Sequence, residues 1–281
     1  MRLLKSIDDC SNWSNSQKKT LGFVPTMGAL HEGHLSLVRL SKKACNKTIV
    51  SIFLNPKQFS KSEDLDSYPS SIEEDLEKLK EESVDAVFIP QIDEMYKDSQ
   101  RDYWFKTPLS LKLEGRSRPL FFKGVTMVVH KLFKIIQPTH AVFGQKDAQQ
   151  LLIIKQMIKK NNHSIQLIAG PTVRSKGGLA LSSRNTYLNA RETKIAHNIY
   201  LGLLKIKSCL GSGEKDTRAL KNAFSDYISQ FDELSIDYIS IACEKSLEEV
   251  VGDINKKVLI STAVFLNNVR LIDNFSYSPS T

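Results

Sequence analysis

Residues 25–34 read Pro25-Thr26-Met27-Gly28-Ala29-Leu30-His31-Glu32-Gly33-His34, and they carry the strongest structural signal in the chain. An apolar run precedes it (Leu21–Val24), and a helical pattern of apolar residues follows it (Leu35–Leu40). The succession predicts a strand, a loop and a helix. The first turn of such a helix offers backbone N–H groups and the positive end of the helix dipole. Because His31 and His34 are three residues apart, we expect both rings on one face of that turn, where a polyphosphate would bind.

The His-x-Gly-His pattern resembles the signature of nucleotidyltransferases, which activate a carboxylate or a phosphate with ATP. Two other interpretations are an ordinary polar helix start and a metal site. The zinc-protease helix motif needs two histidines four residues apart, whereas His31 and His34 are three apart and Gly33 weakens the helix between them. Gly33 also leaves room for a nucleotide to approach. We therefore expect no metal-ligating residues at this site.

The composition is that of a globular protein with a core: 281 residues, 41% hydrophobic and 25% charged. No apolar run is long enough to span a bilayer, and Met1–Lys5 lacks a signal-peptide core. We therefore expect a cytoplasmic location and no membrane partner. The cysteines form no Cys-x-x-Cys pair, which indicates neither a disulfide framework nor a zinc ribbon. They are Cys10, Cys45, Cys209 and Cys243.

The net charge of +8 permits a nucleic-acid partner, and a basic RNA-binding protein is one alternative function. However, the lysines are spread along the chain and mixed with acids, as in Glu73–Lys78. The sequence contains neither an arginine-rich tract nor a stripe of interleaved aromatic and basic residues. A small anionic substrate needs only a local basic site. We therefore expect no nucleic-acid partner.

Short apolar runs alternate with helical patterns through residue 174, which predicts βαβ units and an α/β fold with a Rossmann-like, doubly wound parallel sheet. The irregular segment from Tyr96 to Lys123 predicts a long excursion over the edge of the sheet. The expected strands are 21–24, 48–54, 86–89, 141–143 and 165–169, and the expected helices are 33–45, 71–82, 124–136 and 147–160.

The pattern changes after Thr172. Residues 175–186 are rich in glycine and serine and are interpreted as a linker or a lid. Two expected helices and then three expected strands follow, which predicts a small α+β domain. We therefore expect two domains, 1–174 and 175–281, the second serving as a lid. The expected elements of the second domain are helices 191–210 and 217–230 and strands 235–242, 257–264 and 268–273.

Three further polar clusters follow apolar runs, where ligands bind in open α/β sheets. The first is Asn55–Phe59. Gln58 carries a hydrogen-bond acceptor and two donors, so it can hold a hydroxyl and a carboxylate of a small polar substrate. An ordinary Asn-Pro turn explains the same residues equally well.

The second cluster begins at Gly144, which allows close approach of a ligand. Lys146 supplies a cation for phosphate charge, and we expect Asp147 to cap the following helix. Gln149 or Gln150, in the first turn of that helix, is expected to face the ligand. A capped surface turn is the alternative interpretation.

The third cluster is Leu181–Asn185. Its two serine hydroxyls and Arg184 can surround a phosphate with several donors. Gly177 and Gly178 would let this segment close after a ligand enters. Helix-capping serines beside a solvated arginine are the alternative.

Together these clusters resemble the pantoate–β-alanine ligase (pantothenate synthetase) family nearly end to end. The chain departs from the family pattern at Gln145, where the family usually has Glu. It also departs at Leu120–Gly124, where a His-Phe-Arg-Gly-like run is common. Most of the specific motifs lie in the first 190 residues. The matching stretches are Val24–His34, Ser51–Phe59, Asp66–Pro69, Leu113–Pro119, Phe143–Asp147 and Gly178–Asn185.

The resemblance implies a ligase that works in two steps. The carboxylate of pantoate attacks the α-phosphorus of ATP to give pantoyl adenylate and pyrophosphate. The amine of β-alanine then attacks the activated carbonyl and releases AMP and pantothenate. The resemblance also implies that the first domain binds nucleotide and pantoate, that Mg²⁺ accompanies ATP, and that the protein is a homodimer. Another adenylyl or cytidylyl transferase of the same fold is the alternative enzyme.

The resemblance assigns these roles residue by residue. His34, together with His31 and Lys146, is implied to be catalytic, donating to phosphate oxygens as charge builds. Gln58 and Gln150 are implied to hold pantoate, with Gln58 also near β-alanine. The residues implied to contact ATP are Met27, Gly28, Ala29, Leu30, His31, Glu32, Gly33, His34, Gly144, Gln145, Lys146, Asp147, Val173, Leu181, Ser182, Ser183 and Arg184.

Overall fold

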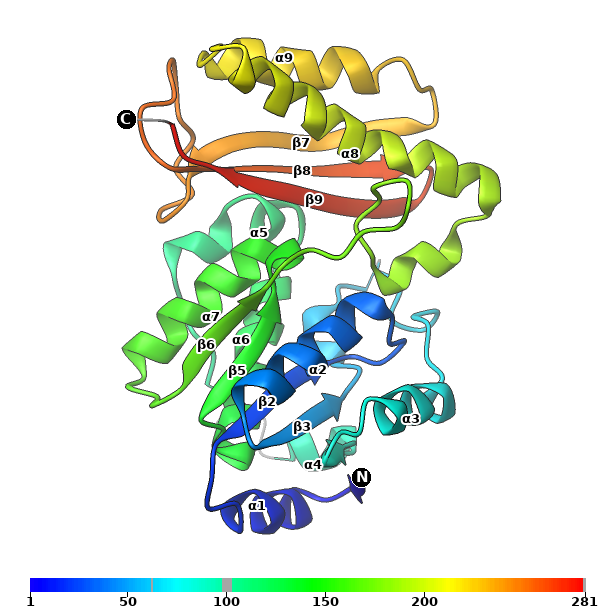
Figure 1. Cartoon of the computed structure of the whole chain (residues 1–281), viewed down its shortest axis with the longest axis vertical. Coiled ribbons are helices and arrows are strands. Elements are labelled where there is room, and N and C mark those ends of the chain that lie inside the picture. Colours follow the sequence, from blue (N-terminus) through cyan, green and yellow to red (C-terminus); the bar gives the residue numbers. More distant parts are fainter. Residues whose placement is uncertain (62, 98–102, 280–281) are drawn as a thin grey trace. The chain divides into compact units, whose positions relative to one another are not determined.

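The computed structural model describes residues 1–61, 63–97 and 103–279. The chain forms two compact units, Met1–Pro171 and Thr172–Thr281 (Figure 1). The boundary predicted from the sequence lies between residues 174 and 175. Within the described residues, no helix is both long enough and apolar enough to cross a membrane.

Six parallel strands form the sheet of the first unit, in the order β1-β4-β3-β2-β5-β6. They are β1 (Arg2–Leu4), β2 (Leu21–Thr26), β3 (Lys47–Ile52), β4 (Ala86–Phe88), β5 (His140–Gly144) and β6 (Gln166–Gly170). Val24 of β2 lies beside Val50 of β3, and both are fully buried. β3 is buried at every residue after the first, as expected for a strand covered on both faces. The predicted doubly wound parallel sheet is confirmed.

Helices connect these strands, and α2 determines where the strongest sequence motif lies. α2 packs so closely on β2 that a Cβ at Gly22 would lie 2.1 Å from Ser41 Oγ. Leu37 and Val38 of α2 join the apolar core formed by the strands. The helices of this unit are α1 (Ile7–Asn15), α2 (Glu32–Ala44), α3 (Ile72–Glu81), α4 (Ile92–Tyr96), α5 (Glu114–Ser117), α6 (Phe121–Ile136) and α7 (Ala148–Lys160).

Some elements of the first unit differ from the prediction. β1 is too short to give a periodic pattern, and it was not predicted. The polar helix α1 was also missed; its start is fixed by Ser6, whose hydroxyl accepts from Asp9 N–H. α6 begins at Phe121, whereas the prediction placed its start at residue 124. Gly124 lies inside the first turns of this helix, although glycine usually weakens a helix. Part of the predicted excursion, residues 98–102, lies outside the described residues.

The second unit has the α+β organisation predicted for it. Leu203 and Phe224 from its helices and Ile260 from its sheet lie in one apolar core. The sheet is antiparallel, with strands in the order β7-β8-β9. The elements are α8 (Ala190–Gly211), α9 (Thr217–Ile228), β7 (Leu234–Cys243), β8 (Val258–Leu266) and β9 (Val269–Tyr277).

Candidate active site

The order of the first sheet reverses between β2 and β5, two neighbouring strands that are not consecutive in sequence (Figure 1). At such a switch point, the connections leave in opposite directions and open a crevice beyond the carboxyl ends of the strands, where ligands bind. The loop Met27–His31 follows β2, and the turn Gln145–Asp147 follows β5. Both sequence clusters with phosphate-binding chemistry in this unit therefore flank the same switch point.

The loop before α2 has a backbone conformation that few residues adopt. The φ angle is 91° at Gly28 and 50° at Ala29. Glycine accepts a positive φ without penalty, whereas a residue with a Cβ is strained there. A Cβ at Gly28 would also lie 3.1 Å from Asp75 Oδ2 and 3.3 Å from Ile52 Cγ2. Both conformation and space therefore require a glycine at position 28.

His31 and His34 cap the start of α2 with their ring nitrogens. His31 Nδ1 accepts a hydrogen bond from Gly33 N–H at 3.1 Å, and His34 Nδ1 accepts from His31 N–H at 3.4 Å. The ring centroids are 4.1 Å apart, which confirms that the two rings lie on one face. Because Nδ1 is an acceptor in each ring, the neutral imidazole carries its proton on Nε2. Each ring therefore keeps one N–H donor for a ligand.

This cap determines which N–H groups at the start of α2 can donate to a phosphate. The sequence predicts that backbone N–H groups of the first turn bind phosphate. In the structure, Gly33 N–H donates to the His31 ring, and His34 N–H donates to His31 O at 2.8 Å. The backbone N–H groups of Gly33 and His34 are therefore already bonded. His31 and His34 offer a ligand their ring Nε2–H groups instead.

The surroundings keep both histidines neutral. Burial lowers the pKa of His31 to about 4 and holds the pKa of His34 well below its usual value. The positive charges of Lys146 and Lys78 lower both pKa values further. Lys146 Nζ lies 3.7 Å from Asp147 Oδ1, and the Lys146 side chain is half-buried. The structure thus brings together two neutral donors and one cation, and the neutrality of the histidines is a finding that the sequence did not predict.

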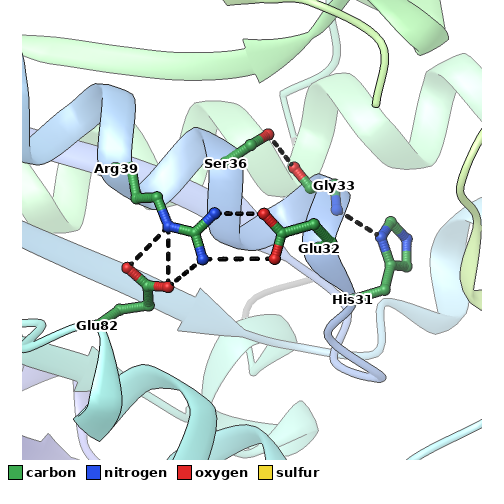
Figure 2. A network of polar contacts seen from close by, with 6 residues as sticks. All are labelled: His31, Glu32, Gly33, Ser36, Arg39 and Glu82. Carbon is green, nitrogen blue, oxygen red and sulfur yellow. Dashed lines mark hydrogen bonds and ion pairs between the residues drawn. The ribbon is translucent and has the colours of Figure 1, made fainter. Parts of the chain in front are cut away.

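Figure 2 shows how Arg39 joins the start of α2 to the end of α3. Its guanidinium pairs with Glu32, the first residue of α2, and its Nε donates to both carboxylate oxygens of Glu82 at 3.0 and 3.1 Å. The Ser36 hydroxyl donates to Gly33 O at 2.8 Å (Figure 2). The Arg39 side chain is 48% exposed, so these ion pairs contribute little stability. The Glu32 carboxylate, predicted to lie at ATP, is held by Arg39 in the structure.

Gln58 lies in a short 3₁₀ turn (Pro56–Gln58) and is 7% exposed. Its Oε1 accepts from Asn55 Nδ2 at 3.0 Å, and its Nε2 donates to Met27 Sδ at 3.0 Å. Asn55 Oδ1 accepts from the Tyr96 hydroxyl. The ordinary-turn interpretation describes the backbone but does not account for a buried amide network. This network joins the predicted pantoate residue to Met27, one of the predicted ATP residues.

Gly124 of α6 supports the turn that carries Gln58. Asn55 Nδ2 donates to Gly124 O at 3.1 Å. A Cβ at Gly124 would lie 2.3 Å from Lys57 O and 2.4 Å from Gln58 N. Gly124 ends the run Leu120–Gly124, in which the chain departs from the family pattern. Only a residue without a Cβ at this position leaves room for the turn that carries Gln58.

Gln149 and Gln150 have different surroundings. Gln149 is buried, and its Nε2 donates to Leu109 O and to Lys112 O, both at 2.7 Å. Its Oε1 accepts from Glu114 N–H at 3.1 Å, so this amide supports the irregular segment between α4 and α6. The half-buried Gln150 side chain forms no hydrogen bond with the described residues. Gln150 is therefore the glutamine whose amide is available to a ligand.

The turn after β5 differs from the prediction in one respect. Asp147 stands at the N-cap position of α7, but its side chain makes no capping hydrogen bond, so the predicted cap is wrong. Its carboxylate lies next to Lys146 instead. A Cβ at Gly144 would meet only Leu37 Cδ1, at 3.9 Å, so protein packing does not require this glycine. Gln145, which replaces the family's usual Glu, is exposed.

The third cluster belongs to the second unit. Leu181 N–H donates to Val173 O at 3.0 Å and closes a hairpin. Ser182 Oγ accepts from Arg184 N–H at 3.3 Å, so the helix-capping interpretation holds for this serine. Ser183 is buried, and Arg184 is half-buried. The role of these residues in ATP binding stays a prediction.

Gly177 and Gly178 are predicted to let this segment close, but the structure shows a packing role. A Cβ at Gly177 would lie 2.0 Å from the His197 ring. A Cβ at Gly178 would lie 2.3 Å from the Tyr200 ring, and Gly178 has a φ of 93°. Close contact with α8 therefore explains both glycines, and closure of the segment stays a prediction.

Two residues of α3 at this site are missing from the predicted set. Asp75 Oδ1 accepts from Leu30 N–H at 2.7 Å, and Lys78 Nζ donates to Leu30 O at 2.9 Å. The sequence does contain a signal for Asp75, which falls in the apolar stripe marked by Ile72 and Leu79. A carboxylate at a core position needs a polar partner.

The Pantoate-beta-alanine ligase family matches residues 2–276 of the chain. A pantothenate synthetase of Thermosipho africanus is 48% identical over 277 residues, covering 98% of this chain and 99% of that protein. The crystal structure of pantothenate synthetase from Thermus thermophilus is 35% identical with a TM-score of 0.94, covering 99% of this chain and 100% of that one. The crystal structure of a pantoate-beta-alanine ligase from Francisella tularensis, complexed with beta-gamma ATP and beta-alanine, is 33% identical to this chain. Its TM-score is 0.80, and the match covers 98% of this chain and 97% of that one. The chain belongs to the pantoate–β-alanine ligase family.

Proposed function

We propose that this chain is an ATP-dependent ligase that condenses pantoate with β-alanine through a pantoyl-adenylate intermediate. Family membership supports the reaction, as do relatives named for it and a relative complexed with beta-gamma ATP and beta-alanine. The observation that carries the proposal is the pair of mutually capping histidines, each with a free Nε2–H, beside Lys146 at the switch point.

In the first step, a pantoate carboxylate oxygen attacks the α-phosphorus of ATP and pyrophosphate leaves. Negative charge then builds on the phosphate oxygens. The Nε2–H groups of His31 and His34 donate to these oxygens, and Lys146 supplies a full positive charge. Because burial lowers the pKa values of both histidines, the imidazoles are neutral before ATP binds and donate through Nε2–H. Their mutual cap fixes both rings before the substrate binds.

In the second step, the amine of β-alanine attacks the acyl carbonyl, and AMP and pantothenate are released. Gln58 and Gln150 hold pantoate in this scheme, with Gln58 also near β-alanine. A primary amide suits this task because it offers an acceptor and two donors without adding charge. Neither step needs a protein nucleophile, so positioning and charge stabilisation account for the catalysis.

The other predicted contacts belong to the same proposal. In the first unit, Met27–Leu30, Gly33 and Gly144–Asp147 contact ATP, and the exposed Glu32 contributes through the start of α2. In the second unit, Val173 and Leu181–Arg184 supply further donors, and this unit serves as the lid.

Mg²⁺ accompanies ATP in this proposal. The groups around His31 and His34 are mostly N–H donors and lysine cations, and the Asp147 carboxylate, whose charge acts on His31, lies beside Lys146. We therefore assign the ion to the ATP phosphates. Among the described residues, no group of three or more His, Cys, Asp or Glu side chains is arranged to hold a metal ion. A homodimer and a cytoplasmic location are proposed from family membership alone.

Pyrophosphate release tests the proposed reaction directly. Purified protein with ATP and pantoate should release pyrophosphate in proportion to enzyme, and β-alanine should convert this into continuous turnover with AMP and pantothenate as products. Pyrophosphate release that requires CTP, or another acceptor in place of pantoate, would support a different nucleotidyltransferase. Binding to random RNA with a steep salt dependence would support the RNA-binding alternative. Light scattering at micromolar concentration tests the homodimer.

A further inference from the structure

Helix α3 binds both backbone polar groups of Leu30. The N–H of Leu30 donates to Asp75 Oδ1 at 2.7 Å, and its carbonyl oxygen accepts from Lys78 Nζ at 2.9 Å. Asp75 and Lys78 are three residues apart and therefore share one side of the helix. Leu30 directly precedes His31, so these contacts hold the last residue before the histidine cap.

Packing does not explain the carboxylate at position 75. Asp75 is 1% exposed, and its Oδ2 has no hydrogen-bond partner among the described residues. Burial raises the pKa of this carboxyl, although backbone N–H groups of Leu30 and Ala29 lower it. A buried, half-satisfied carboxylate reduces stability. Leu79, one turn further along α3, is buried and apolar, and an apolar residue at position 75 would avoid that penalty.

The loop that these two residues hold needs support. Ala29 has a φ of 50°, a conformation that is strained for a residue with a Cβ. Gly28 precedes it, also with a positive φ, and faces Asp75 Oδ2. Released from α3, Ala29 would return to an ordinary backbone conformation. His31 would then leave the position from which it caps α2 and contacts His34.

We propose that Asp75 and Lys78 are positioning residues for the adenylation step, which fix the His31–His34 pair through the backbone of Leu30. This inference rests on the proposed function, because it gives the two residues a role in pyrophosphate release. The exposed Arg39 network is a weaker connection between the same two helices, because solvent screens it.

Matched variants on the same helix separate positioning from a general effect of charge. Lys78→Met and Lys80→Met each remove one positive charge, but Lys80 is exposed on the other side of α3. Lys78→Met should lower kcat for pyrophosphate release about 10- to 100-fold, because a displacement near 1 Å has effects of this size. Lys80→Met should leave kcat within about twofold of wild type. KM for β-alanine should not change in either variant.

Asp75 is tested by comparing two substitutions with an exposed control. Asp75→Ala removes the acceptor for Leu30 N–H, and kcat should fall as in Lys78→Met. Asp75→Asn keeps an acceptor at that position and should recover most of the activity. Glu73→Gln, on the exposed face, should behave as wild type. All kcat values are measured at a temperature at which circular dichroism shows each variant folded. An Asn variant as impaired as the Ala variant would overturn the assignment, and so would an Ala variant as active as Glu73→Gln.

A second readout does not depend on activity. In the substrate-free protein, the ring resonances of His31 and His34 should shift in Lys78→Met and Asp75→Ala, while those of His140 and His197 stay in place. Unmoved His31 and His34 resonances would overturn the positioning role. A wild-type protein without pyrophosphate release would refute the proposed function, and the resonances would still decide whether α3 positions the histidines.

Discussion

Replacing Gly124 with alanine should displace the turn that carries Gln58. The new Cβ would lie 2.3 Å from Lys57 O and 2.4 Å from Gln58 N, whereas ordinary contacts begin near 3.4 Å. Both neighbouring atoms belong to the backbone, so no side chain can rotate away. The turn or α6 must retreat by about 1 Å, and such overpacking costs about 1–3 kcal/mol of stability.

The displacement should affect pantoate more than ATP. A shift of about 1 Å at a substrate-positioning residue can reduce the rate on the order of 100-fold, so kcat/KM for pantoate should fall about 10- to 100-fold. KM for ATP should change little, because Gln58 is not among its proposed contacts. Steady-state pyrophosphate release with each substrate varied in turn gives both values.

Gly211 provides the matched control. It is the last residue of α8, has no neighbouring atom within 4 Å of a built Cβ and has no positive φ. Gly211→Ala should therefore leave activity unchanged and, through higher helix propensity, change stability by less than about 1 kcal/mol. If Gly124→Ala keeps both the pantoate kcat/KM and the melting temperature of Gly211→Ala, the packing argument for Gln58 is refuted.

Three further predictions concern the phosphate donors of the site, the Gln58 amide, and two histidines with lowered pKa values, His31 of the site and the buried His130 of α6. His34→Ala and Lys146→Ala should each weaken the adenylation transition state by about 3–4 kcal/mol. His34→Ala should also lose about 1 kcal/mol of stability with its capping hydrogen bond, whereas Lys146→Ala should lose little; near-normal pyrophosphate release in either would remove its catalytic role. Gln58→Ala should lower kcat/KM for pantoate about 5- to 150-fold, corresponding to about 1–3 kcal/mol, while ATP affinity measured without pantoate stays the same; equal weakening of both substrates would contradict the assignment. Burial lowers the pKa of His31 and of His130 to about 4 in the folded protein. Between about pH 4 and the ordinary value of about 6.5, the unfolded chain therefore binds more protons than the folded protein. The free energy of unfolding should fall as pH drops through this range. Urea titrations at several pH values measure this loss, and His130→Gln should make it smaller; the same loss in this variant would show that His130 does not contribute.

Much of the fold follows from local sequence patterns. The apolar run at Leu21–Val24 and the helical pattern after His34 are strong signals, and β2 and α2 occur where these signals predict them. Their pairing partners are also predictable, because consecutive βαβ units place strands side by side. β1 could not be predicted in this way, since it has only three residues and pairs with β4, which is distant in the sequence.

The sequence predicts which residues gather at the switch point, but it does not predict their geometry. His31, His34 and Lys146 follow the carboxyl ends of β2 and β5, and sheet topology alone brings such positions together. The mutual cap depends on positive φ angles in the preceding loop, which no periodic pattern encodes. Asp75 contacts this loop only because α3 packs against it, although the two lie 45 residues apart. The capping role expected of Asp147 failed because its carboxylate lies beside Lys146.

The histidine cap also affects which ions this site can attract. Neutral imidazoles compete strongly for copper, nickel and zinc, and they bind these metals through a ring lone pair. In each ring of the pair, that lone pair already accepts a backbone N–H. To bind a transition metal, each ring would have to give up the hydrogen bond by which its Nδ1 caps α2, or lose its Nε2 proton. The same two hydrogen bonds that prepare the histidines for phosphate oxygens therefore occupy the lone pairs through which these rings would bind a transition metal.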